Sequence, residues 1–171
     1  MSKQIRIANI INDSIVDGPG IRLTVFFQGC AHACKDCFNK ETWDFNGGVL
    51  YDIDKIYDIA MKNPLLDGIT LSGGDPLYQV EGALELVKLF KNTDLNIMVY
   101  TGFTYEELIE ISKNKPVMHE FLENIDYLVD GPFVTELRDI SLKFRGSSNQ
   151  RIIDVQKTLK ENKVVLADFS N

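Results

Sequence analysis

Short apolar, β-forming runs alternate with helical patterns along most of this 171-residue chain. The predicted central strands cover residues 23–27, 69–71, 97–100 and 127–129, and apolar residues recur at helical spacing between them. Strands that alternate with helices form parallel sheets with right-handed crossovers. The strand count is too small for a closed barrel of eight strands. We therefore expect the α/β class, as an open, partial (βα) barrel of parallel strands.

Weaker patterns lie on either side of these strands. Residues 5–11 alternate enough for a short edge strand, and residues 133–150 have the composition of a loop. A strand near 151–153 and a short helix near 155–161 follow. No repeat, low-complexity tract or linker divides the chain, so we expect residues 1–171 to form a single domain.

Three helix starts carry capping residues. Asp52 is a candidate N-cap for the helix after residue 52, and Thr104 with Glu107 has the spacing of a capping box. Pro116 suits the first position of a further helix because proline needs no hydrogen-bond partner for its nitrogen there.

Composition excludes several classes of partner. The net charge of −7 gives no sign of a surface for nucleic acid or anionic membranes. No run reaches the roughly 18 consecutive apolar residues of a membrane span, and the first six residues lack the apolar core of a secretory signal. Closely spaced cysteines fit a reducing compartment, so we expect a cytoplasmic protein.

Polar residues and glycines follow each central strand directly. The carboxyl ends of parallel strands converge on the ligand site in βα architectures. We therefore expect these residues to face one another around one edge of the sheet. They are Cys30, Gly73, Gly74, Asp75, Thr101 and Asp130.

All three cysteines of the chain, Cys30, Cys34 and Cys37, lie in one segment, residues 30–37, which we call the cysteine loop. A disulfide would leave one of them over, so this spacing favours a metal site. A [4Fe–4S] cluster usually takes four cysteines, so three would leave one iron open. The alternatives are a zinc site completed by His32 or Asp36, or simply buried thiols.

The cysteine loop, Cys-x3-Cys-x2-Cys after the first central strand, resembles the cluster motif of the radical S-adenosylmethionine (SAM) enzymes. The flanking segments 16–22, 26–30 and 39–43 resemble those of the glycyl-radical-enzyme activases. Segments 72–77, 129–133 and 145–150 are similar to those of proteins that activate anaerobic ribonucleoside-triphosphate reductase. The resemblance covers roughly residues 5 to 155.

The resemblance implies a truncated radical SAM fold and a [4Fe–4S] cluster on Cys30, Cys34 and Cys37. The open iron would bind the amino and carboxylate groups of SAM. One electron, from a donor such as a flavodoxin or ferredoxin, would release a 5′-deoxyadenosyl radical. That radical would take hydrogen from a glycine in the large subunit of the anaerobic reductase. The chain would then be a radical SAM oxidoreductase, with no catalytic residue beyond the cluster ligands.

The resemblance also implies a set of SAM contacts at the strand ends. Gly73, Gly74 and Asp75 would lie near the amino group, although the family more often has glutamate where this chain has Asp75. Thr101 and Asp130 are candidates for the ribose hydroxyls or the methionine carboxylate. The alternative for these residues is an ordinary role in turns and helix caps.

Six residues have further candidate roles. The backbone of Asp36, Cys37 and Phe38 could reach the adenine edge, and the Phe38 ring could instead pack in the core. Arg22 and Arg145 could bind carboxylates in a fork or form surface ion pairs. We expect His32 to be solvated rather than a ligand.

Three other functions remain compatible with the sequence. The chain could activate another glycyl-radical enzyme, such as pyruvate formate-lyase. It could be a small radical SAM enzyme that acts on a nucleobase-like substrate. It could also be a non-enzymatic zinc-binding module, which metal analysis would distinguish from both.

Overall fold

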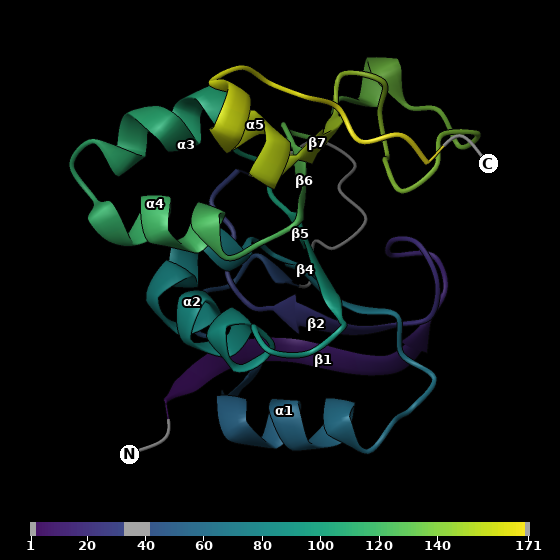
Figure 1. Cartoon of the computed structure of the whole chain (residues 1–171), viewed down its shortest axis with the longest axis vertical. Coiled ribbons are helices and arrows are strands. Elements are labelled where there is room, and N and C mark those ends of the chain that lie inside the picture. The colour runs from purple at the N-terminus through teal and green to yellow at the C-terminus, as the bar shows by residue number, and fades with distance from the viewer. Residues whose placement is uncertain (1–2, 33–41, 170–171) are drawn as a thin grey trace.

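The computed structural model describes residues 3–32 and 42–169, which contain one mixed sheet in the order β3-β1-β2-β4-β5-β6-β7 (Figure 1). Strands β2, β4, β5 and β6 run parallel, whereas β1, β3 and β7 pair antiparallel with their neighbours. The bounds are β1 Gln4–Ser14, β2 Arg22–Phe27, β3 Val49–Asp52, β4 Gly68–Gly73, β5 Asn96–Tyr100, β6 Tyr127–Asp130 and β7 Arg151–Asp154.

The predicted parallel centre is confirmed, but the margins of the sheet differ from the prediction. Strand β1 is not an edge strand, because β3 covers its outer side. Sequence reasoning missed β3, which has only four residues and exposes Val49 and Leu50. The connections explain the antiparallel margins, since residues 15–21 are too few for a parallel crossover and no α-helix lies between β6 and β7.

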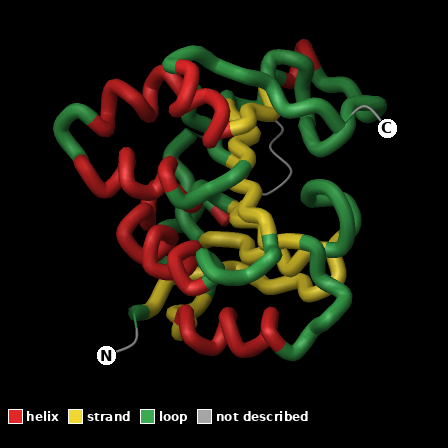
Figure 2. Tube along the Cα trace, in the orientation of Figure 1, coloured by secondary structure: helices red, strands yellow, loops and turns green. Residues whose placement is uncertain are grey.

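The helices gather on one side of the strands, and the loops after β1 and β6 lie on the other side (Figure 2). The capping predictions are confirmed: Asp52 caps α1, Thr104 and Glu107 form a capping box on α3, and Pro116 begins α4. No helix in the described part of the chain is long and apolar enough to cross a membrane. The helices are α1 Ile53–Met61, α2 Val80–Leu89, α3 Tyr105–Ser112, α4 Pro116–Glu123 and α5 Val155–Glu161, with 3-10 turns η2 Pro76–Gln79 and η3 Thr135–Leu137.

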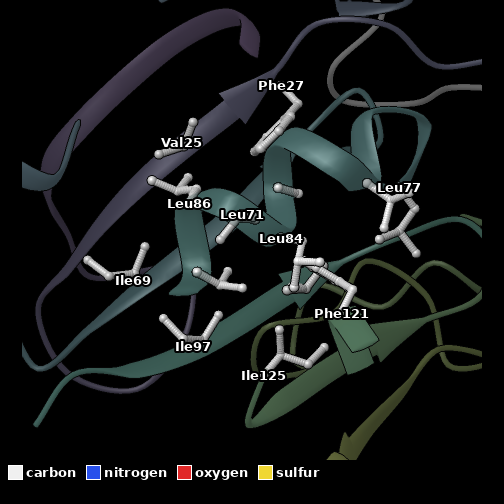
Figure 3. Close-up of a cluster of buried hydrophobic side chains, with 14 of the residues drawn as sticks. Val25, Phe27, Ile69, Leu71, Leu77, Leu84, Leu86, Ile97, Phe121 and Ile125 are labelled. Carbon is white, nitrogen blue, oxygen red and sulfur yellow. The ribbon is translucent and has the colours of Figure 1, made fainter. Parts of the chain in front are cut away.

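Alternation along the parallel strands separates the apolar core from the site. Val25, Ile69, Leu71 and Ile97 point toward the helices and pack with Leu84 of α2 (Figure 3). Intervening side chains must point to the opposite face, because the side chains of a strand alternate. We call that face the inner face; its residues are Arg22, Thr24, Phe26, Thr70, Ser72, Met98, Tyr100, Tyr127 and Val129.

Candidate functional site

A cavity of about 650 Å³ opens at the carboxyl ends of the parallel strands. Strand ends contribute Cys30, Gly73, Gly74 and Thr101 to its wall, and the following loops contribute further residues, among them Arg145. This volume lies within the range of small-molecule sites. The predicted convergence of strand ends is therefore present, and the first cysteine lies on the wall of the cavity.

Backbone hydrogen bonds hold Cys30 at the end of β2. The N–H of Cys30 donates to the carbonyl of Trp43 at 3.2 Å, and the N–H of Gly29 donates to Thr42 at 2.6 Å. The chain before and after the cysteine loop is thus joined at its base. Cys34, Cys37, Asp36 and Phe38 lie outside the described residues, so their predicted roles stay predictions.

The glycine turn after β4 packs directly on the end of β2. Gly73 has a φ of +99°, and a Cβ there would lie 2.4 Å from the nitrogen of Phe27. A Cβ on Gly74 would lie 2.6 Å from the carbonyl oxygen of Gly29. The glycines are therefore needed for the close approach of two backbones, and they also form part of the cavity wall.

Asp75 is fully buried, and its carboxylate already has several protein donors. It accepts from Thr101 Oγ1 at 2.8 Å, from the N–H of Gly102 at 2.9 Å and from the N–H of Leu77 at 3.0 Å. The cavity wall, as far as the structure describes it, includes Gly73 and Gly74 but not Asp75. The geometry thus does not favour the predicted contact between Asp75 and an amino group of SAM.

The expectation that His32 is solvated is wrong. Its Nε2 lies 2.6 Å from Asp75 Oδ2, and only 16% of the side chain is exposed. The ring packs against Phe103 and Tyr78, with centroid distances of 4.6 and 5.5 Å. Because Nε2 faces a carboxylate, this nitrogen is engaged with Asp75 and is not free to bind a metal, which leaves only Nδ1 for the zinc alternative. No pattern in the sequence pairs His32 with a residue 43 positions away.

Thr101 and Asp130, the remaining SAM candidates, are placed differently. Thr101 lies on the cavity wall, although its hydroxyl donates to Asp75. Asp130 lies two positions after Leu128 on β6, so both side chains point to the same face of the sheet, and Leu128 packs in the core on the helix side. Its carboxylate accepts from the N–H of Tyr105 at 2.8 Å and binds Arg151. The prediction for Asp130 is therefore wrong: its carboxylate binds the first N–H of α3 and Arg151, and it is not among the described residues that line the cavity.

Both expectations for Arg22, a carboxylate fork and a surface pair, are wrong. Its side chain is fully buried on the inner face. It donates to Thr70 Oγ1 at 2.7 Å and to the carbonyls of Pro19 and Ile69 at 2.9 and 3.0 Å. Burial lowers the pKa of Arg22 to about 10, so the guanidinium stays charged at neutral pH.

Arg145, in contrast, lies on the cavity wall. Its Nη1 donates to the carbonyl of Gln150 at 3.0 Å. Its Nε is buried without a hydrogen-bond partner among the described residues. A buried donor without a partner destabilises the fold, so this atom is suited to an acceptor on a ligand.

Exposed apolar side chains surround the mouth of the cavity. Ile15 and Val16 are each 71% exposed, and Ile140 is 90% exposed. All three contribute to the wall of the cavity, Ile15 and Val16 from the loop after β1 and Ile140 from the loop before β7. We call these three residues the apolar rim. Sequence reasoning did not find it, because isolated apolar residues in loops carry no periodic signal.

Comparison with known families places the chain in a defined class. Residues 16–153 match the family described as "4Fe-4S single cluster domain". This match spans Cys30 and the strand ends that form the cavity.

Curated relatives narrow the assignment to a family. The activating protein of anaerobic ribonucleoside-triphosphate reductase from Haemophilus influenzae is 42% identical over 149 residues, covering 81% of this chain and 90% of that protein. The protein of the same name from Escherichia coli K12 is 40% identical (80% and 90% covered), and that of phage T4 is 31% identical (80% and 86% covered). The chain therefore belongs to the family of anaerobic ribonucleoside-triphosphate reductase-activating proteins.

Proposed function

We propose that this protein activates an anaerobic ribonucleoside-triphosphate reductase through radical SAM chemistry. The observation that carries the proposal is the position of Cys30 beside the Gly73–Gly74 turn on one cavity wall. A cluster there would be held by Cys30, Cys34 and Cys37. When bound, it supplies one electron that splits SAM into methionine and a 5′-deoxyadenosyl radical, which takes hydrogen from a glycine of the reductase.

The described part of the cavity fits such a cosubstrate. Its volume of about 650 Å³ suits a nucleoside with an amino-acid tail. Aromatic residues Phe26, Tyr100 and Phe144 supply apolar wall, and Ser72 supplies a hydroxyl. The unpartnered Nε of Arg145 suits a carboxylate. Each of these groups is already in place in the described structure.

In this proposal, the residues of the chain position the cosubstrate and shield the radical from water. They do not transfer protons. Burial raises the pKa of Tyr100 far above its ordinary value, so its phenol stays neutral at pH 7. The guanidinium of Arg22 is charged, and each of its three nitrogen atoms donates a hydrogen bond within the protein. Apolar walls that exclude water protect a radical from quenching.

The apolar rim is the proposed contact for the reductase. A target glycine has to reach the cavity through its mouth, and the mouth is bordered by Ile15, Val16 and Ile140. Exposed apolar side chains that border a site are typical of protein contacts. The electron would come from a flavodoxin or ferredoxin. An oxygen-labile cluster in a chain with closely spaced cysteines supports a cytoplasmic location.

Anaerobic reconstitution tests the proposal directly. The protein is loaded with iron and sulfide, reduced, and given SAM, and 5′-deoxyadenosine and methionine are quantified. The large reductase subunit is then added, and a glycyl radical is sought by electron paramagnetic resonance. Pyruvate formate-lyase serves as the control partner and should give no radical. Zinc without iron or sulfide in the isolated protein would contradict the proposal.

A further inference from the structure

The Asp75 carboxylate joins three segments that are far apart in the sequence. It accepts from Thr101 Oγ1 and the N–H of Gly102, both just after β5, while it begins the η2 turn after β4. Its Oδ2 also faces His32 Nε2 at 2.6 Å, and His32 lies between Cys30 and Cys34. One buried carboxylate therefore connects the cysteine loop to the ends of two parallel strands.

The surroundings of His32 are fitted to this contact. A Cβ on Gly102 would lie 2.5 Å from the Cδ2 atom of the His32 ring, so only glycine leaves room for the imidazole. Phe103 meets the ring edge-on, with an interplanar angle of 78°. Tyr78, from the η2 turn, packs on it with an angle of 51°. The ring is thus enclosed by the same two turns that Asp75 connects.

We infer that Asp75 is a positioning residue, which anchors the cysteine loop to the ends of β4 and β5 through His32. It is therefore not a ligand for the amino group of the cosubstrate. A charge-assisted hydrogen bond to a buried carboxylate is among the stronger single contacts available to a loop. The shorter aspartate is suited to this role, because its oxygens reach the adjacent turn and the ring together. The anchoring role does not depend on the proposed function. Only the expected effect of the anchor on cluster loading rests on it.

The test uses the full chain without its cluster, kept anaerobic and reduced. Hydrogen–deuterium exchange is followed by mass spectrometry on peptides that contain Gly29 and Cys30, whose amides bond to Thr42 and Trp43. His32→Ala should speed their exchange about tenfold, the change that loss of one such hydrogen bond produces. Thermal unfolding by circular dichroism checks that the variant is folded.

Two further variants sharpen the result. His32→Gln keeps a side-chain N–H that can donate to Asp75, so it should restore most of the protection. His119→Ala removes the only other histidine of the chain, an α4 residue whose side chain is 52% exposed, and should change nothing. Wild-type exchange in His32→Ala would overturn the inference, and so would failure of His32→Gln to recover any protection.

Measurements of iron content and SAM binding distinguish an anchoring role of Asp75 from a direct contact with SAM. If Asp75 anchors the loop, Asp75→Asn and His32→Ala should lower iron content after reconstitution to a similar extent, and the double variant should be little worse. If Asp75 bound the SAM amino group, Asp75→Asn alone would weaken SAM binding in equilibrium dialysis, at normal iron content, and the inference would fail. The exchange experiment needs neither cluster nor SAM, so its failure would leave the proposed function intact.

Discussion

Arg151 binds Asp130 through two nitrogen atoms: Nε lies 3.1 Å from Oδ1, and Nη2 lies 2.5 Å from Oδ2. The two residues are also direct register partners between β7 and β6. The Asp130 carboxylate is buried, and it accepts from the first N–H of α3 as well. This ion pair attaches the antiparallel β7 to the parallel part of the sheet on the helix side, away from the cavity.

We expect Asp130→Asn to lower the free energy of unfolding by about 2 kcal/mol, because it leaves Arg151 without its buried partner. The Arg151 side chain is 33% exposed, which keeps the cost below that of a fully buried pair. Urea unfolding of the cluster-free protein measures the change. SAM binding to the folded variant should stay at the wild-type level. A large loss of affinity would mean that Asp130 contacts the cosubstrate.

Glu106 supplies a pH-dependent part of the same network. Its hydrogen bond to Arg151 lowers its pKa below the ordinary value. A lowered folded-state pKa stabilises the protein above the unfolded-state pKa, and this stability is lost as pH falls through the folded value. Because Glu106 is largely exposed, we expect Glu106→Gln to cost only about 0.5 kcal/mol at pH 7. Denaturant titrations between pH 7 and 3 should show this difference disappear at the acid end.

The stability of the inner face depends on the guanidinium of Arg22. Arg22→Met should lower the free energy of unfolding by about 3 kcal/mol, because Thr70 and the carbonyls of Pro19 and Ile69 lose their donor. Arg22→Lys should recover only part of this, since one ammonium cannot reproduce the planar set of donors. Chemical denaturation compares the three proteins, and equal stability of the lysine variant and wild type would show that the planar set of donors is not required.

The apolar rim should affect the reductase and not SAM cleavage. We expect Ile140→Asp to reduce the yield of glycyl radical about tenfold, because a charge is placed where an apolar contact forms. The yield of 5′-deoxyadenosine without reductase should not change. Leu65→Asp is the matched control: Leu65 is 68% exposed and precedes the amino end of β4, at the opposite end of the strands. Equal losses in both variants would mean that the rim is not the contact.

Cluster ligation is tested by Cys34→Ala. The variant should lose the site-differentiated cluster and SAM cleavage together, because two thiolates cannot hold a cube with one open iron. Iron and sulfide analysis, with quantification of 5′-deoxyadenosine, measures both. Cleavage at the wild-type rate would show that the ligand assignment is wrong.

The parallel centre of the fold and the location of the site could be predicted from the sequence, because both depend on local patterns. Buried runs such as residues 23–27 identify strands, and Cys30 and Gly74 follow strands directly. Helix caps such as Asp52 are equally local. Each of these signals is contained within a few consecutive residues.

The sequence did not reveal which side chains pair across the fold. Arg22 and Thr70 are 48 positions apart, and His32 and Asp75 are 43 apart. Strand parity could have excluded Asp130 from the cavity, because it has the parity of the core residue Leu128. That argument requires the register of β6, and a four-residue strand leaves its register undetermined by pattern alone.

Side chains of each central strand alternate between a row that faces the helices and a row on the inner face. This alternation constrains where the gene can gain or lose codons. Deletion of one codon within β5 would turn Tyr100 and Met98 toward the helices and bring core residues into the cavity. The same deletion in the turn before β5, around Thr93, would leave both rows in place. Tolerated insertions and deletions should therefore cluster in the connections, and the strands should keep their residue count even where their residues are exchanged.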